Sequence, residues 1–371
     1  MFEPGGMQTV AAFTDTYLPT VNGVTYTVRT WRDRWEARGG RMGVVYPRDD
    51  GYEPDPREFP VSSVAFPFYP GFRFGSPSVP AGAGDLDPEV VHAHTPFTLG
   101  LAARRLARLR DAPLVVSYHT PAREYARYIS DALAGVISRV ADRYERWFFG
   151  QADAVVVPSA TAATRLRTDG TPIHVVSNGV DVERFRPADD EADAAFRARH
   201  DLPDGPLVGY TGRHGYEKCL EDLLAATEAL DVGVALAGDG PARSMLESRA
   251  ADRGDVRFLG FLDRDAVSGF YSALDVFAFP SPVETQGLVA LESIACGTPV
   301  VAVDGGALSE TVTDGETGYH YEPGDVDGFA SAIRRALDGQ SRLGQRCLDA
   351  RDELSVARSI DRLADVYGAV T

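Results

Sequence analysis

Arg213 and Lys218 stand five residues apart in the stretch GRHGYEKCLED, where a predicted strand ends and a predicted helix begins. The N-terminus of a helix favours anions, because the helix dipole and the unpaired amides both attract negative charge. Lysine supplies a compact charge and arginine a rigid fork, so the pair predicts a phosphate site. Lys218 is the only lysine among 37 basic residues. The alternative is a single exposed surface lysine.

Two glutamates lie eight positions apart in SPVETQGLVALESIACG. Glu284 falls in the loop before a predicted helix, and Glu292 falls inside that helix, which Gly297 ends. In a chain with 54 acidic residues such a pair also arises by chance. The residues around the pair are what make it informative.

Three histidines follow apolar runs in the first half of the chain, His92 and His94 in VVHAHTPF and His119 in SYHT. A histidine that ends a buried strand is either a hydrogen-bonded core residue or an active-site residue. We expect His119 in the active site and favour the core for His92. Both alternatives stay open for His94.

The elements that must position these side chains alternate regularly. Apolar runs in the first half are separated by helical patterns and cover residues 9–15, 41–47, 90–94, 113–120, 153–159 and 173–181. The second half repeats the alternation at 206–212, 232–238, 256–260, 275–281 and 299–304. Such alternation predicts an α/β fold with two doubly wound, Rossmann-like parallel sheets. The aromatic stretch 61–74 is predicted to be a loop.

The predicted domains are an N-terminal domain over 1–183, a linker over 184–205 and a C-terminal domain over 206–353. The amphipathic C-terminal helix, 354–371, is expected to pack back on the first domain. Two such domains facing each other make a deep cleft, and open α/β sheets bind ligands at the carboxyl ends of their strands.

Eight motifs in order span nearly the whole chain: TDTYLPTVNGV, VVHAHTPF, SYHT, SNGVDVERFRP, YTGRHGYEK, AGDGP, FLGFL and ETQGLVALE. Together they resemble the retaining glycosyltransferases of the two-Rossmann (GT-B) class, family 4. Gln286 stands where that family often has an aromatic residue. This variant and the opening motif are similar to the diacylglycerol glucosyltransferases and to GDP-mannose-dependent mannosyltransferases.

The resemblance implies roles for the residues that could do chemistry. Arg213 and Lys218 would hold the diphosphate of a nucleotide sugar bound mainly in the C-terminal domain. Glu284 would contact the donor sugar's hydroxyls, and Glu292 the ribose hydroxyls. His119 would face the reacting sugar from the N-terminal domain, which binds the acceptor.

The remaining donor contacts implied by the resemblance come from glycines and apolar residues. Gly23, in NGV, would lie against the diphosphate, where a side chain would clash. Backbone amides at Gly287 and Leu288 would bind the distal phosphate at a helix start. Phe261 and Leu262 would flank the base.

The implied reaction is transfer of a hexose from UDP-glucose or GDP-mannose to a hydroxyl with retained anomeric configuration. No nucleophilic carboxylate for a double displacement is identified, so a front-face displacement is expected. Arg213 and Lys218 can replace a metal, and we expect neither a metal nor another cofactor. The alternatives are an enzyme of N-glycan or surface-polysaccharide assembly, a nucleotide-sugar epimerase on the same fold, and a non-catalytic binder.

The net charge of −17 argues against nucleic acid as a partner, because binding to nucleic acid depends on neutralising its phosphates. Acidic composition with almost no lysine is typical of salt-loving archaea, and a GC-rich genome is the alternative explanation. Three cysteines without paired spacing favour a reducing, cytoplasmic setting. No apolar run is long enough to span a membrane.

Residues 97–150 nevertheless carry nine arginines against five acids. Within them, 123–150 interleaves arginine and aromatic residues on a helical pattern, which suits an anionic lipid surface. This stretch and the aromatic residues 66–74 suggest a lipid-borne or lipid-linked glycan acceptor and peripheral docking on the inner face of the cell membrane. The alternative is that the aromatic residues are core and the arginines only solvate the helix.

Overall fold

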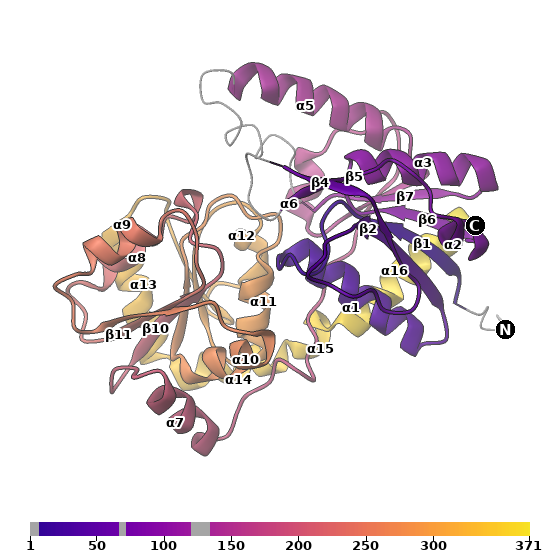
Figure 1. Cartoon of the computed structure of the whole chain (residues 1–371). Coiled ribbons are helices and arrows are strands. Elements are labelled where there is room, and N and C mark those ends of the chain that lie inside the picture. The colour runs from indigo at the N-terminus through magenta and orange to yellow at the C-terminus, as the bar shows by residue number, and fades with distance from the viewer. Residues whose placement is uncertain (1–6, 67–71, 120–133) are drawn as a thin grey trace. The chain divides into compact units, whose positions relative to one another are not determined.

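The computed structural model describes residues 7–66, 72–119 and 134–371 (Figure 1). The chain forms two compact units, unit 1 with residues 1–178 and 356–371, and unit 2 with residues 179–355. Each unit contains one sheet whose strands are all parallel. The prediction of two doubly wound α/β domains is confirmed.

Unit 1 has a seven-stranded sheet in the order β3-β2-β1-β6-β7-β8-β9. Its strands are β1 (Thr9–Phe13), β2 (Arg41–Pro47), β3 (Glu58–Val61), β6 (Val90–Ala93), β7 (Leu114–Ser117), β8 (Ala154–Val157) and β9 (Ile173–Val175). Its described helices are α1 (Gly23–Ala37), α2 (Ala81–Asp85), α3 (Thr98–Arg110), α5 (Ala134–Phe149), α6 (Ala160–Arg165) and α16 (Val356–Val370).

The strands of unit 1 are buried on both faces, because successive side chains point to opposite sides of a sheet. In β1, Ala11 and Phe13 join one apolar cluster, which includes side chains of α3 and the end of α5. Val10 and Ala12 join a second cluster with side chains of α1 and α16. Near-continuous apolar runs were therefore the right signal for a covered parallel sheet.

Unit 2 has a six-stranded sheet in the order β12-β11-β10-β13-β14-β15. Its strands are β10 (Leu207–Thr211), β11 (Gly233–Ala237), β12 (Val256–Gly260), β13 (Val276–Phe279), β14 (Val300–Val303) and β15 (Gly318–Tyr321). Its described helices are α7 (Asp190–Arg199), α8 (Leu220–Thr227), α9 (Arg243–Arg249), α10 (Arg264–Ala273), α11 (Leu288–Ala295), α12 (Leu308–Thr311), α13 (Val326–Asp338), α14 (Gln340–Asp349) and α15 (Arg351–Leu354).

Both sheets have a point at which the strand order reverses. In unit 1 this point lies between β1 and β6, and in unit 2 it lies between β10 and β13. Loops that leave the carboxyl ends of two such strands diverge to opposite sides and leave room for a ligand. The loops that follow β10 and β13 contain Arg213 and Glu284. The loop that follows β1 leads to Gly23 at the start of α1, and the loop that follows β6 contains His94.

The C-terminal helix α16 belongs to unit 1, where it lies beside α1 (Figure 1). Tyr367 packs edge-on against Trp35 with ring centroids 5.1 Å apart. The boundaries between the units follow Asn178 and Ser355, rather than residues 183 and 353 as predicted.

The predicted linker 184–205 is not a linker, because it is part of unit 2. Phe185 and Phe196 are buried in the core of that unit, and Phe196 lies 6.3 Å from the ring of Phe270. Charged residues flank both aromatic residues in the sequence, so the segment has the composition of a polar linker.

Three other expectations about elements were wrong or incomplete. The stretch 61–74 is not wholly a loop, since β4 (Ser63–Ala65) and β5 (Arg73–Gly75) pair as an antiparallel hairpin, and residues 67–71 lie outside the described part. The edge strands β3 and β15 were missed. Pro60 interrupts the first, and proline in a strand is tolerated only at a sheet edge.

Candidate functional site

Lys218 and Glu284 come together at the point of unit 2 where the strand order reverses. The Lys218 Nζ atom lies 2.5 Å from Glu284 Oε1, and the two side chains are 19% and 15% exposed. Lys218 ends a single 3-10 turn, Tyr216–Lys218, before α8, while Glu284 lies in the loop between β13 and α11. Residues 66 apart in sequence thus form one charged pair at the carboxyl edge of the sheet.

Lys218 is fully charged in this setting. Burial opposes the ammonium charge, but the carboxylate of Glu284 outweighs it and raises the pKa of Lys218 above its ordinary value. Arg213 forms a second pair with Glu217 on the same loop. Each cation of the predicted phosphate site therefore faces a carboxylate in this structure, and an anionic ligand has to share or displace that partner.

Backbone hydrogen bonds join the loop that carries Arg213 to the AGDGP turn. The amide of His214 donates to the carbonyl of Asp239 at 2.8 Å, and the amide of Ala242 donates to the carbonyl of His214 at 2.8 Å. A Cβ on Gly238, whose φ is +111°, would lie 2.0 Å from the carbonyl oxygen of Gly212. The turn fits only a glycine at that position, so AGDGP positions the loop.

Glu292 lies on α11 and is buried. The hydroxyl of Tyr271 donates to its Oε2 at 3.0 Å, and the guanidinium of Arg264 lies 3.1 Å from its Oε1. Burial raises the pKa of Glu292, and the charge of Arg264 counteracts part of that shift. The Glu292 carboxylate is therefore already bound by two side chains of the protein. Its predicted contact with a ribose stays a prediction, and it requires the carboxylate to bind the ribose hydroxyls and Arg264 at the same time.

Gly287 precedes the first residue of α11, Leu288, and adopts φ +80°. A Cβ there would lie 2.6 Å from Leu308 Cδ2 and 3.0 Å from Phe279 Cε1. The preceding loop is tied back by the amide of Ala307, which donates to the carbonyl of Glu284 at 3.1 Å. The helix start that the sequence predicts at this point is present, and it follows shortly after Glu284.

The two apolar residues predicted at the base site differ in environment. Phe261 is 65% exposed, whereas Leu262 is half-buried and packs against the core of unit 2. An accessible aromatic face at the end of β12 suits stacking on a planar ring.

Three histidines of unit 1, His92, His94 and His119, form a buried stack beside Trp31. The rings of His92 and His94 lie 4.0 Å apart, and those of His94 and His119 lie 5.4 Å apart and nearly parallel. His92 Nδ1 and the hydroxyl of Tyr367 lie 2.6 Å apart. His92 is thus a hydrogen-bonded core residue, as favoured from the sequence.

His94 and His119 are joined directly, with 3.1 Å between His94 Nδ1 and His119 Nε2. Burial lowers the pKa of His119 to about 4 and that of His92 to about 3. Both imidazoles are therefore neutral near pH 7. His94 Nε2 is buried without a hydrogen-bond partner among the residues that the structure describes.

Gly23 is the first residue of α1, and a Cβ on it would meet nothing within 4 Å. The side chain of Asn22 caps the helix by accepting from the amide of Thr25 at 2.9 Å and donates to Thr16 Oγ1 at 2.7 Å. The open space at Gly23 is compatible with a ligand that approaches the backbone.

The structure thus brings Arg213, Lys218 and Glu284 to one loop cluster of unit 2, with Gly287 and Leu288 at the adjoining helix start. His119 and Gly23 lie in unit 1. Sequence reasoning missed the carboxylate partner of Arg213, the cation beside Glu292 and the buried histidine of the loop: Glu217, Arg264 and His214. Glu217 and Arg264 could not be singled out from the sequence, because the chain is rich in acidic and basic residues. His214 lies within the motif GRHGYEK, but no role was predicted for it.

Across residues 7–66, 72–119 and 134–371, no group of three or more His, Cys, Asp and Glu side chains has an arrangement that could hold a metal ion.

Two family models match the chain, glycosyltransferase family 4 over residues 21–184 and glycosyl transferases group 1 over residues 193–351. The chain is 32% identical to a GDP-mannose-dependent alpha-mannosyltransferase of Mycolicibacterium smegmatis, over 88% of this chain and 87% of that one. It is 28% identical to an alpha-monoglucosyldiacylglycerol synthase of Streptococcus pneumoniae, over 96% of this chain and 85% of that one.

The chain is also 32% identical to a sulfoquinovosyl transferase of Arabidopsis thaliana over 71% of its own residues, and it spans 52% of the length of that relative. A solved sucrose-phosphate synthase from Thermosynechococcus elongatus matches its structure with a TM-score of 0.77 at 22% identity, covering 98% of both chains. That likeness shows a shared fold. With its eight motifs, its two parallel sheets and these matches, the chain belongs to glycosyltransferase family 4 and has the GT-B fold.

Proposed function

We propose that the protein transfers a hexose from a nucleotide sugar, of the UDP-glucose or GDP-mannose type, to the hydroxyl of a lipid-borne acceptor. The transfer retains the anomeric configuration and needs no metal ion. The pairing of Lys218 with Glu284 at the carboxyl edge of the unit 2 sheet carries the proposal. It sets a phosphate-binding cation beside a carboxylate that can accept from sugar hydroxyls.

The charges suit a nucleoside diphosphate leaving group. Negative charge develops on the phosphate oxygens as the glycosidic bond breaks, and preorganised cations and helix amides stabilise it. Lys218 and Arg213 supply the cations, and the start of α11 supplies the amides. The leaving phosphate then accepts the proton of the attacking hydroxyl on the same face of the sugar, which retains the configuration.

Incubation with labelled UDP-glucose or GDP-mannose and extracted lipids tests the proposal. We expect label in the lipid fraction, an α-linked product from an α-linked donor by NMR, and equal rates with and without EDTA. The assay runs in molar KCl, because the acidic composition suggests a halophilic protein. An isomeric nucleotide sugar without transfer would identify an epimerase, and transfer to soluble glycans alone would refute the lipid acceptor.

A basic and partly apolar surface on α5 supports the lipid acceptor. Trp147 is 43% exposed and Val140 is 64% exposed, while Phe148 and Phe149 are fully buried. The guanidinium of Arg104 lies 5.2 Å from the centre of the Trp147 ring. The aromatic residues of α5 are thus divided between core and surface. Residues 123–133 of the predicted membrane-docking stretch lie outside the described residues.

Within the described part of the chain, no helix has the length and apolar character of a membrane span. We propose instead that the protein docks peripherally on the inner, cytoplasmic face of the membrane through α5. Trp147 would enter the headgroup region while three exposed arginines on the same helix bind anionic lipid: Arg139, Arg143 and Arg146.

Co-sedimentation with vesicles that contain anionic phospholipid tests the docking. We expect binding that weakens as the salt concentration rises, because exposed charges are then screened. Replacing the three arginines of α5 by serine should weaken binding on the order of a hundredfold, at roughly 1 kcal/mol for each cation near the surface.

The matched control replaces three exposed arginines of other helices by serine: Arg334, Arg346 and Arg362. It makes the same change in net charge, so it separates a local patch from the overall charge of −17. Equal binding by the two triple variants would contradict docking through α5, as would a lack of binding by the wild type at low salt.

Gly23→Ala should raise the donor KM about tenfold without lowering stability, a change of about 1.4 kcal/mol in binding. The added methyl group meets no protein atom within 4 Å, so it interferes only with a ligand that approaches the backbone. Gly368→Ala on α16 is the control, because a Cβ there also meets nothing. Identical donor KM values for the two variants would exclude a diphosphate contact at Gly23.

A further inference from the structure

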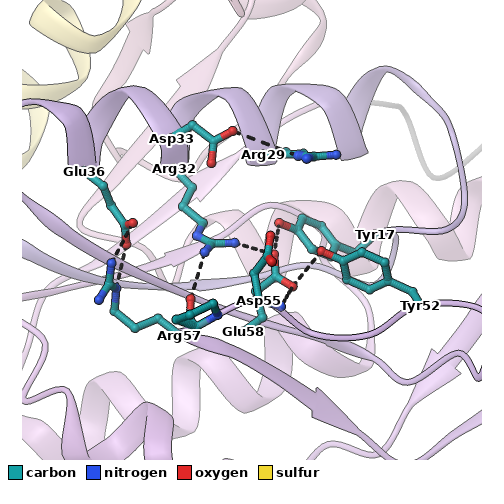
Figure 2. Close-up of polar contacts among 10 residues, drawn as sticks. Tyr17, Arg29, Arg32, Asp33, Glu36, Tyr52, Asp55, Arg57 and Glu58 are labelled. Atoms are coloured by element: carbon teal, nitrogen blue, oxygen red, sulfur yellow. Dashed lines mark hydrogen bonds and ion pairs between the residues drawn. The ribbon is translucent and has the colours of Figure 1, made fainter. Parts of the chain in front are cut away.

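Glu58, the first residue of β3, is a buried carboxylate with donors on every side (Figure 2). The hydroxyl of Tyr17 donates to Oε1 at 2.7 Å, and the hydroxyl of Tyr52 donates to Oε2 at 2.8 Å. The amide of Asp55 donates to Oε2 at 2.9 Å, and the guanidinium of Arg32 pairs with Oε1. Of the residues in this network, only Tyr17 belongs to one of the eight motifs, TDTYLPTVNGV.

The network joins three separate elements of unit 1. Tyr17 lies in the loop after β1, Arg32 lies on α1, and Glu58 begins β3. The Arg32 and Glu58 side chains are 7% and 1% exposed, so the pair is shielded from water. Removing one partner of a shielded pair leaves an uncompensated buried charge, so loss of either Arg32 or Glu58 would be strongly destabilising.

Tyr17 donates to Glu58 in this network. The residue is 3% exposed, and its ring packs against the ring of Tyr46 with centroids 4.8 Å apart. Burial and the negative charge of Glu58 raise the pKa of the Tyr17 phenol well above its ordinary value, so it stays protonated. The hydrogen bond to the carboxylate is therefore charge-assisted and short.

The loop that Tyr17 belongs to, residues 14–22, is also anchored near its start. Asp15 accepts from Thr95 Oγ1 and Thr98 Oγ1, each at 2.6 Å. At its end, Asn22 caps α1, and the amide of Thr20 donates to the carbonyl of Tyr17 at 3.0 Å. Tyr17 is thus the middle anchor of a loop that leads directly to Gly23.

We propose that Tyr17, held by the Glu58–Arg32 pair, is a positioning residue that orders the loop 14–22 for binding of the nucleotide sugar. This inference rests on the proposed function, in which Gly23 lies against the donor's diphosphate. A ligand that requires an ordered loop binds more weakly in proportion to the fraction of molecules in which the loop is disordered. Loss of the Tyr17 anchor therefore acts on donor binding and leaves the chemical step unchanged.

Tyr17→Phe and Tyr52→Phe form a matched pair. Each removes one phenolic hydroxyl from Glu58, keeps its ring, and leaves three of the four donors in place. Only Tyr17 belongs to the loop. Tyr17→Phe should raise the donor KM about tenfold with kcat within twofold, which marks lost ground-state binding. Tyr52→Phe should leave the donor KM within twofold of the wild type.

Hydrogen exchange on the same variants gives a readout that does not depend on activity. The amide of Thr20 should exchange faster in Tyr17→Phe and at the wild-type rate in Tyr52→Phe. Equal KM values and equal exchange in the two variants would overturn the positioning role, since both hydroxyls would then be merely structural. A wild-type protein that fails to transfer sugar would refute the proposed function, while Thr20 exchange would still decide whether Tyr17 orders the loop.

Discussion

Replacing Glu284 by glutamine is expected to lower kcat for sugar transfer by about a hundredfold while the protein stays folded. A hydrogen bond to a charged group contributes roughly 1.5–3 kcal/mol, and each 1.4 kcal/mol or so changes a rate about tenfold. Glutamine keeps the shape but loses the charge that meets the sugar hydroxyls and holds Lys218 at 2.5 Å. Initial rates with saturating donor and acceptor measure the effect.

Asp201→Asn provides the control for Glu284→Gln. It changes a carboxylate to an amide in another ion pair of unit 2, Asp201 with Arg257 at 3.1 Å, and it lies on the protein surface. We expect wild-type kcat from this variant. A Glu284→Gln enzyme with a kcat within threefold of the wild type would show that the carboxylate does not act on the donor sugar.

Lys218→Arg is expected to lower kcat/KM about a hundredfold, although it preserves the positive charge. The Lys218 side chain is 19% exposed and its ammonium touches Glu284, so a compact charge fits where a planar fork of five donors does not. Removing one preorganised donor to a developing oxyanion typically costs roughly 100–1,000-fold. Titration with UDP and GDP, beside the kinetics, shows how much of the loss is in nucleotide binding.

Arg199→Lys, on the exposed face of α7, controls for the exchange itself. It should leave activity unchanged, because this arginine lies away from both loops of the charged pair. Full activity of Lys218→Arg would mean that the only lysine of the chain is there by chance. Lys218→Met removes the positive charge that Lys218→Arg keeps, so its activity should be at least as low as that of Lys218→Arg.

Much of the fold was accessible from the sequence because parallel sheets leave a strong local signal. Strands covered on both faces are continuous apolar runs, and β2 has the predicted bounds, Arg41–Pro47. Edge strands have one neighbour and weaker patterns, which is why β3 and β15 were missed. The stretch 184–205 misled for a related reason, since two buried aromatics, Phe185 and Phe196, anchor an otherwise charged segment.

The candidate site, too, was predictable from the sequence only in part. Arg213, Lys218, Glu284 and Gly287 were predicted because each belongs to a motif whose residues are close in sequence. Their pairing was not predicted, because it depends on which strands are neighbours: β10 and β13 adjoin although β11 and β12 lie between them along the chain.

The sequence by itself determined the family, the two-sheet fold and the loops that carry the candidate donor contacts, because these depend on local pattern and motif order. Only the tertiary structure decided the partners of the charged groups. It pairs Lys218 with Glu284 and Arg264 with the buried Glu292, and it brings donors from three parts of the chain to Glu58. A buried charge depends on whatever the fold brings within about 4 Å of it, and no spacing along one chain specifies that.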